Sequence, residues 1–510
     1  MPTPPRREPL TWGLCALLFA LPWATYGSAI FRRYGLRDDY AILREALEEP
    51  GKIIRVCSTY GRPLYGALLE LSLRGADEIG ELSELRVLSV LGLSLLAVAF
   101  FRLLVREGWT HAPAFLLAAF LPLTPSAQVL ASWGICWPQA VAMLLGVAAF
   151  ALAPRGLPGE ERVTRRRVFA LLGIVSATLT YQVSGLFYAV LVAAALVVRR
   201  DSLADTGRWL TRHLVLLGAG LGTAFALTRL LNLLGLTTIS PRVRIETNWL
   251  DKAGWMLTHL VPNALALGAL NQTPGSPPPS YLVMVALTLL LLVAGITVEG
   301  RRAGLAGSGR WVLGLVLLSA VTSSVSFLAA ERWPTYRTLY ALTGVCGVFF
   351  AASLVNLGGC LPGRGPRAAM GVLTGFVALS ALLAHRQALE LFAEPQGREL
   401  ALMEEGARQL VPSAHPRVFV VTAPTQGTFA PRRYLDEFGS VSVDAEWVAR
   451  EMWKAVLRER FPHERDVTRL YRFGAGTGLP ARNQYDILVD MRPPSRAPSA
   501  PMAWGARARP

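Results

Sequence analysis

Two adjacent carboxylates carry the clearest chemical potential in the chain. Asp38 and Asp39 follow Arg37, a few residues after the first long apolar segment. At a membrane surface such a pair can bind a divalent cation, or one member can act as general base while the other tunes its pKa. Asp is also a favoured N-cap residue, and the segment 40–47 is predicted to form a short helix. The spacing alone therefore leaves a catalytic pair and a helix cap as alternatives.

Arginines in predicted outer loops form the second candidate group. Arg62 lies in Tyr60-Gly61-Arg62-Pro63, while Arg332 and Arg337 share a short loop between two apolar segments. Short outer loops usually carry few arginines, and the planar guanidinium grips phosphate through paired N–H groups. We therefore expect Arg332 and Arg337 to hold a lipid phosphate. The alternatives are that Arg332 pairs with Glu331, or that both arginines contact lipid headgroups.

Histidine and cysteine offer no further chemistry. The six histidines fall mainly at segment ends without metal-ligand spacing, and the five cysteines are widely spaced with no C-x-x-C pair. A structural zinc site and a disulfide framework are therefore not expected.

The composition indicates that these polar groups belong to a membrane protein. Of 510 residues, 52% are hydrophobic and only 17% are charged, and the mean hydropathy is +0.38; soluble domains carry about 25% charged residues. The net charge of +16 comes from basic residues of which all but three are arginine. Many of these lie in short segments between apolar runs, as Arg165–Arg167 and Arg301-Arg302 do, so they predict membrane orientation and no nucleic-acid partner.

About eleven apolar segments are predicted to be transmembrane helices. The predicted segments are Leu10–Phe31, Val87–Leu104, Pro113–Leu123, Trp137–Leu152, Val168–Thr180, Val183–Val198, Leu214–Leu234, Tyr281–Val298, Trp311–Ala329, Thr338–Leu357 and Ala368–Ala384. The stretch Val168–Val198 is either one long span or two short helices hinged at Tyr181-Gln182. Loop charge favours the hinged pair and a cytoplasmic N-terminus, because the arginine-rich loops then share one side. We expect the first segment to be a retained helix, since no small-residue cleavage site follows it.

The predicted spans leave three polar regions on the outer side. They are a first outer loop (32–85), a second large outer loop (235–280) and a soluble tail. We predict a transmembrane domain over 1–386, an extracytoplasmic α/β domain over 387–492 and a disordered end over 493–510. Within the α/β domain, Arg417–Thr422 and Tyr485–Val489 are predicted strands, and Asp444–Arg460 is a predicted helix capped by Asp444.

The arrangement resembles the GT-C class of integral-membrane glycosyltransferases. The features that carry the resemblance are Asp38-Asp39 after the first span, Gly61-Arg62-Pro63-Leu64 in a long outer loop, and Tyr181-Gln182 at an outer hinge. Within that class the chain is most similar to bacterial O-antigen glucosyltransferases of the Gtr type. The resemblance covers roughly residues 10–384 and does not extend to the tail.

The resemblance implies a mostly helical enzyme of the bacterial inner membrane that takes a sugar, glucose in the Gtr type, from a polyprenyl phosphate carrier. Its acceptor would be an extracytoplasmic molecule such as a lipid-linked envelope glycan. By this resemblance Asp38 or Asp39 is the base, Arg332, Arg337 and Arg62 bind the donor phosphate, and Tyr181 and Gln182 line the substrate groove. A divalent cation (Mg or Mn) at Asp38 and Asp39 stays open, because no second acidic motif completes a metal site.

Two other functions fit a many-helix body. A transporter or lipid flippase usually places carboxylates inside its spans, and the predicted spans contain almost none. A non-catalytic protein of envelope assembly would use the outer α/β domain to bind a partner, and would not need Asp38 or Asp39.

Overall fold

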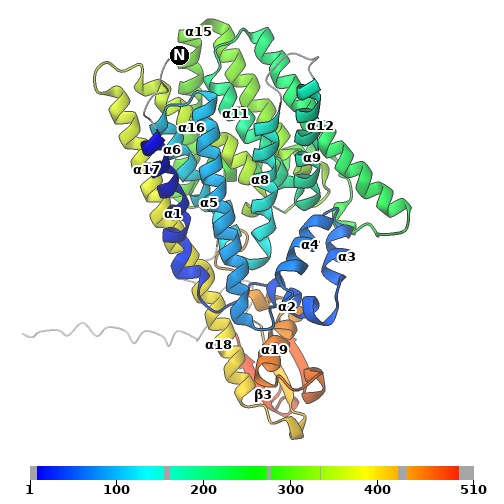
Figure 1. Cartoon of the computed structure of the whole chain (residues 1–510). Helices are drawn as coiled ribbons and strands as arrows, with labels where there is room; N and C mark the ends of the chain where they lie inside the picture. The colour runs from blue at the N-terminus through cyan, green and yellow to red at the C-terminus, as the bar shows by residue number, and fades with distance from the viewer. Residues whose placement is uncertain (1–7, 154–160, 273–276, 334, 423–433, 493–510) are drawn as a thin grey trace, which may run out of the picture.

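The computed structural model describes residues 8–153, 161–272, 277–333, 335–422 and 434–492. A long bundle of helices carries a small domain with a β-sheet at one end (Figure 1). The described helices are α1 (Glu8–Ile30), α2 (Asp38–Glu48), α3 (Lys52–Thr59), α4 (Pro63–Ser72), α5 (Leu82–Glu107), α6 (His111–Phe120), α7 (Pro125–Ser132), α8 (Trp137–Leu152), α9 (Glu161–Thr180), α10 (Gln182–Gly185), α11 (Tyr188–Val198), α12 (Leu203–Leu233), α13 (Trp249–Trp255), α14 (Val261–Leu265), α15 (Pro279–Leu328), α16 (Tyr340–Gly358), α17 (Gly365–Ala388), α18 (Glu394–Arg408) and α19 (Glu446–Arg460). The strands are β1 (Arg417–Val421), β2 (Arg472–Gly476) and β3 (Ile487–Asp490).

The bundle has the helices that a polytopic membrane protein requires. Among the described residues, seven helices are long and apolar enough to cross a membrane, or eight if the bent pair of α6 and α7 counts as one span. A shorter apolar helix covers Gln182–Val198. Each of the eleven predicted segments coincides with helical structure, and the difference in number comes from α15, α9 and the short helices α10 and α11.

α15 is a helical hairpin rather than one helix. Its backbone leaves the helical region at Gly304, where φ is 66° and ψ is −165°. Glu299 and Arg310, on either side of that break, form an ion pair of 2.7 Å. Eleven residues of straight helix would separate them by about 16 Å, so the chain must fold back. Tyr281–Val298 and Trp311–Ala329 are therefore separate helices, as the sequence predicts.

The stretch Val168–Val198 is broken at the predicted hinge. α9 ends at Thr180, Tyr181 is extended with φ of −154° and ψ of 110°, and α10 begins at Gln182. Trp109, which follows α5, donates its indole N–H to the carbonyl oxygen of Ala194, near the other end of α11. α11 therefore runs from the hinge to the far end of the bundle.

Short helices fill both outer loops. The predicted helix over 40–47 is α2, and Pro63 begins α4. α3 lies between them and was not predicted from the sequence. In the second loop, α13 continues through a π-helical turn (Met256–Leu260) into α14, which has Pro262 in its first turn.

The C-terminal domain contains a three-stranded parallel sheet in the order β2-β1-β3. β1 and β3 match the two predicted strands, whereas β2 was not predicted. The predicted cap of α19 is wrong: its N-cap residue is Ala445 and no side chain caps it. Asp444 instead pairs with Arg37 of the first outer loop. A helical path through α17, a π-helical turn and α18 continues across the expected domain boundary at residue 386 into the domain (Figure 1).

Candidate functional site

Asp39 is fully buried where the first outer loop meets the helix bundle. It lies in the first turn of α2 and is 0% exposed. Its Oδ2 accepts a hydrogen bond from the N–H of Leu36 (2.9 Å), and its Oδ1 accepts one from the N–H of Ile135 (3.1 Å). Burial raises the pKa of Asp39 to about 6, although these amides and the charge of Arg86 act in the opposite direction. Asp39 therefore fastens the outer loop to the turn around Ile135.

Arg86 fixes the chain just before the acidic pair. This buried arginine of α5 donates hydrogen bonds to the carbonyl oxygens of Ile30, Arg32 and Tyr34, and its guanidinium carbon lies 4.0 Å from the centre of the Tyr34 ring. The three bonds satisfy carbonyl groups at and beyond the end of α1. Sequence reasoning did not select Arg86. A basic residue directly before the predicted span Val87–Leu104 was the available signal.

Neither carboxylate is the N-cap of α2. The N-cap residue is Arg37, which makes no side-chain cap bond and has φ of 46°. Asp39 reaches back to Leu36 from inside the first turn, so the helix-cap alternative is wrong in its simple form. The structure separates the pair by exposure: Asp38 is partly exposed and Asp39 is buried. Asp38 is therefore the more accessible of the two carboxylates.

Arg62, Tyr181 and Gln182, all predicted site residues, lie together. The Arg62 guanidinium carbon is 4.2 Å from the centre of the Tyr181 ring, and Arg62 Nε donates to Gln182 Oε1 (2.7 Å). Gln182 in turn donates to the carbonyl oxygens of Tyr60 and Gly61. The extended conformation of Tyr181 thus presents two consecutive side chains to the Gly61-Arg62 turn. The α9–α10 break is the physical reason these distant motifs meet.

Arg337 is a half-buried cation held by aromatic rings. It lies in the 3₁₀ turn η6 (Tyr336–Thr338), with its guanidinium carbon 4.7 Å from the Trp133 ring and 5.9 Å from the Trp333 ring. Its Nε is buried and has no hydrogen-bond partner among the described residues. A guanidinium packed on indole faces keeps N–H groups for an anion.

Arg332 has a different environment from Arg337. Its side chain forms ion pairs with Glu246 at 3.2 Å and with Asp251. The pairing expected as an alternative was with Glu331, whose carbonyl oxygen instead accepts a hydrogen bond from Lys252. Two carboxylates already occupy the Arg332 guanidinium, so it is less suited than Arg337 to bind a phosphate.

One turn, Trp133–Cys136, joins these groups into a single site. Trp133 packs on Arg337, and the Ile135 N–H binds Asp39. The Ile135 carbonyl oxygen accepts the hydroxyl of Tyr65, whose ring lies 5.7 Å from that of Tyr181. Two residues of one turn, Trp133 and Ile135, thus contact the Arg337 loop and the acidic loop, and Tyr65 links the turn to Tyr181. The predicted residues other than Arg332 lie at the end of the bundle that carries the C-terminal domain.

The site also includes an acidic pair that sequence reasoning missed. Asp436 Oδ2 accepts a hydrogen bond from the N–H of Tyr336 (2.9 Å), next to Arg337. Glu437 is 3% exposed, and Glu437 Oε2 and Asp436 Oδ1 are both buried without a donor among the described residues. Burial and the neighbouring Glu437 carboxylate raise the pKa of Asp436 well above its usual value. Two close buried carboxylates are most stable when they share one proton.

The donors around Asp39 do not suit a cation, because both of its oxygens face amide hydrogens. In the described part of the chain, no three His, Cys, Asp or Glu side chains form a group that could hold a metal ion. The divalent cation that the sequence left open at Asp38 and Asp39 therefore has no support from the arrangement of Asp39.

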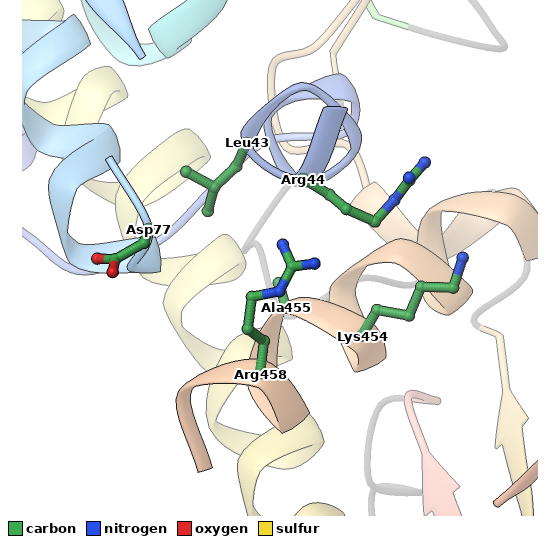
Figure 2. A pocket seen from close by; sticks show the side chains of 6 residues that line it. All are labelled: Leu43, Arg44, Asp77, Lys454, Ala455 and Arg458. Atoms are coloured by element: carbon green, nitrogen blue, oxygen red, sulfur yellow. The ribbon is translucent and has the colours of Figure 1, made fainter. Parts of the chain in front are cut away.

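A small depression between α2 and α19 does not extend this site. It is lined by Leu43 and Arg44 of α2, by Asp77, and by Lys454, Ala455 and Arg458 of α19 (Figure 2). Its volume is about 10 Å³, which is close to the minimum that holds one water molecule. It marks the contact between two helices and is too small for a sugar.

Several solved structures are distantly similar to this chain, all at low sequence identity. The oligosaccharyltransferase of Archaeoglobus fulgidus, solved with Zn and sulfate, is 12% identical over 92% of this chain, with a TM-score of 0.44; the chain spans 62% of its length. ArnT from Cupriavidus metallidurans bound to undecaprenyl phosphate is 12% identical over 90% of both chains, with a TM-score of 0.42. The arabinofuranosyltransferase AftD from Mycobacteria is 16% identical over 83% of this chain and 30% of its own, with a TM-score of 0.40.

No protein-family model and no curated protein matches the chain. At these identities and TM-scores, the structural likeness is too distant to assign an activity.

Proposed function

We propose that the chain is a membrane glycosyltransferase that moves a sugar from a polyprenyl phosphate carrier to an acceptor on the outer side. The observation that supports this most is the turn Trp133–Cys136, which brings the Asp38-Asp39 loop, Arg337 and the Arg62–Tyr181 pair to one place. An accessible carboxylate on a loop that shares this turn with Arg337, at the end of an apolar bundle, suits an acceptor hydroxyl on one side and a lipid phosphate on the other.

In the proposed reaction Asp38 is the general base. It takes the proton of the acceptor hydroxyl while that oxygen attacks the anomeric carbon of the sugar. The bond from the anomeric carbon to the phosphate oxygen breaks, and the polyprenyl phosphate leaves with the electron pair. A single displacement of this kind inverts the anomeric centre. Asp39 positions the loop through its two backbone hydrogen bonds rather than touching the substrate.

Arg337 and Arg62 are the proposed phosphate-binding residues. The phosphate gains negative charge as the sugar leaves, so cations placed beforehand stabilise the transition state more than the ground state. Arg337 has a buried Nε without a described partner, and Arg62 stacks on Tyr181. Arg332 would have to leave Glu246 and Asp251 to contribute. Tyr181 and Gln182 are proposed to line the groove beside the phosphate.

The finer identity follows the sequence resemblance alone. We propose a lipid-linked envelope glycan as acceptor and glucose, as in Gtr-type O-antigen enzymes, as the sugar to test first. The proposed location is the bacterial inner membrane, with a cytoplasmic N-terminus and the C-terminal domain outside.

The test is sugar transfer by the purified full chain in nanodiscs. Polyprenyl-phosphate glucose and other polyprenyl-phosphate hexoses would be supplied with acceptor-containing membranes, and release of polyprenyl phosphate would be followed by mass spectrometry. Consumption of one donor, dependent on the acceptor membranes, supports the proposal. If folded protein consumes no donor with acceptors present, the glycosyltransferase function is rejected and lipid transport becomes the function to examine.

A further inference from the structure

The C-terminal domain touches both sides of the proposed site through one short segment. This segment, Tyr434–Asp444, is called the bridge. Because it precedes α19 and packs on α18, it belongs to the domain that the family resemblance does not cover. Its two ends contact different outer loops of the membrane domain.

The first end of the bridge holds the loop that carries Arg337. Asp436 accepts the Tyr336 N–H at 2.9 Å, and the Phe438 ring lies edge-on to the Tyr336 ring at 5.5 Å. The Leu435 N–H donates to the carbonyl oxygen of Asn271, whose own N–H donates to the Tyr336 hydroxyl at 2.7 Å. The bridge thus contacts both the backbone and the ring of Tyr336, the residue directly before Arg337.

The second end holds the residue before the acidic pair. The Arg37 N–H donates to Ser442 Oγ (2.9 Å), and Arg37 Nη2 lies 3.0 Å from Asp444 Oδ2. Arg37 has φ of 46°, which is costly for a residue with a side chain and persists only when its surroundings hold it. Asp444 and Ser442 hold Arg37 in this conformation. Because Arg37 directly precedes α2, these contacts also fix the position of Asp38 at the start of that helix.

α18 anchors the middle of the bridge. Gln396 and Glu399 of α18 are both fully buried. Gln396 donates to the carbonyl oxygen of Ser440 and accepts from the Ser442 hydroxyl, while Glu399 accepts the Ser442 N–H at 3.1 Å. Since α18 continues the path of the spanning helix α17, the bridge has a fixed base.

We propose that the bridge sets the distance between the two halves of the catalytic site, with Asp444 positioning the Asp38 loop through Arg37 and Asp436 positioning Arg337 through Tyr336. The catalytic meaning of this role rests on the proposed function, whereas the mechanical role does not. Asp444 and Asp436 are positioning residues and do not touch the substrate.

Glu451 provides a matched control for Asp444. Its carboxylate accepts from Arg44 Nε at 2.6 Å, so it also ties the C-terminal domain to α2. The two carboxylate side chains have similar exposure, 12% for Glu451 and 15% for Asp444. Arg44 lies farther along α2 than Asp38, and Arg458 of α19, which pairs with Glu48, extends towards the same part of α2 (Figure 2). A general loss of docking should therefore appear equally in both variants.

The experiment is hydrogen–deuterium exchange of the full chain in nanodiscs, without any ligand. In Asp444→Ala we expect the amides of residues 34–40 to exchange about tenfold faster or more, as losing a hydrogen bond to a charged group implies. In Glu451→Ala the increase should be confined to residues 41–49. Equal effects of both variants on residues 34–40, or no effect of Asp444→Ala there, would overturn the proposal. Unchanged exchange in β1 confirms that the domain stays folded.

A second pair of variants tests the other end and does not depend on Asp444. Asp436 has φ of 66°, which Gly adopts freely and Asn tolerates. Asp436→Gly removes the acceptor of the Tyr336 N–H, whereas Asp436→Asn keeps one. We expect about tenfold faster exchange over residues 335–339 in the glycine variant and, in the asparagine variant, a rate within about twofold of wild type. Equal exchange in the two variants would overturn the proposal at this end.

Turnover separates this inference from the proposed function. If wild type transfers sugar, Asp444→Ala should lower kcat at an unchanged donor KM, and Asp436→Gly should raise the donor KM. If the variants change hydrogen exchange as expected but the protein has no transferase activity, the mechanical role of the bridge stands and the glycosyltransferase function is rejected. Normal kcat and KM in variants with altered exchange would reject the positioning role.

Discussion

Asp38 and Asp39 are adjacent in sequence, but they differ in burial and in hydrogen bonding. Asp39 has no exposed surface and accepts two backbone N–H groups, whereas Asp38 is partly exposed. Burial alone would favour the protonated form of Asp39, and the amide donors offset part of that cost. A carboxylate in such a place fixes the loop, and the partly exposed neighbour is the one proposed to meet the substrate.

The raised pKa of Asp39 makes stability depend on pH in a defined direction. The unfolded carboxyl titrates near 3.8 and the folded one near 6, so the folded state holds the proton more tightly. This stabilisation is complete below about pH 4 and is lost as pH rises through 6, a change of about 3 kcal/mol. We expect the Tm of wild type to fall relative to that of Asp39→Asn between pH 4 and 7. Asp77→Asn, an exposed site in the same outer loop, should follow wild type, and parallel curves for all three would contradict the assignment.

Arg337 and Arg332 give a matched pair for phosphate binding. Arg337→Lys keeps the charge but loses the planar fork and its stacking on Trp133. We expect it to weaken binding of undecaprenyl phosphate in nanodiscs by about tenfold or more, in the range of one charge-assisted hydrogen bond. Arg332→Lys should change the Kd by less than about threefold, because Arg332 already pairs with Glu246 and Asp251. If Arg332→Lys weakened binding of undecaprenyl phosphate more than Arg337→Lys, Arg332 would be the phosphate-binding residue instead of Arg337.

At the scale of elements, the site depends on breaks in regular structure. The extended residue Tyr181 separates α9 from α10, and the turn Trp133–Cys136 separates α7 from α8. Apolar periodicity in the sequence predicts where helices lie, and Tyr181-Gln182 was predicted as a hinge. Which loops the hinge and the turn would meet depends on contacts between residues far apart in sequence, so it was not predictable from spacing.

The sequence-based predictions that were wrong or missing also fail because of contacts between residues far apart in sequence. Asp444 satisfies the local rule for a helix cap, but Arg37, distant in sequence, takes its carboxylate. β2 has the sequence Arg-Phe-Gly-Ala-Gly, which lacks the alternation of a half-buried strand, and it is stabilised by pairing with β1. Asp436 and Glu437 belong to no motif near the other site residues, and only the fold brings them beside Arg337.

Gly61 tests whether the loop of Arg62 needs its observed conformation. Its φ is 73°, and an added Cβ would lie 3.2 Å from Gln182 Nε2. We expect Gly61→Ala to lower the free energy of unfolding by about 1–2 kcal/mol and to weaken carrier binding through Arg62. Gly75→Ala is the control, because Gly75 has no positive φ and nothing within 4 Å of its added Cβ. Equal stability of both variants, measured by thermal unfolding, would show that the turn is not constrained.

At the scale of the whole molecule, exposed apolar side chains distinguish the membrane-spanning bundle from the C-terminal domain. Large side chains such as Leu290 (68% exposed) and Val316 (63%) lie open on α15, as they would against lipid. α11 is buried over nearly its whole length and forms the centre of the bundle. The C-terminal domain lies at the end opposite the α15 hairpin (Figure 1).

The proposed orientation gives a labelling result. Cys360, after α16, is the exposed cysteine among the five, and Leu479, in the C-terminal domain, is 55% exposed. In intact bacterial cells, a membrane-impermeant maleimide should label Leu479→Cys in a chain without other cysteines. It should not label a variant that keeps only Cys360 until the cells are permeabilised. Labelling of Cys360 in intact cells would reverse the orientation.

In the proposed reaction Asp38 removes the proton of the acceptor while a polyprenyl phosphate leaves. The most direct measurement is the rate of polyprenyl phosphate release by wild type, Asp38→Asn and Asp77→Asn, with donor and acceptor membranes at saturation. We expect a loss of about 10²-fold or more for Asp38→Asn, the usual scale for a general base, with undecaprenyl phosphate binding retained and Asp77→Asn close to wild type. Turnover of Asp38→Asn within about threefold of wild type would contradict it.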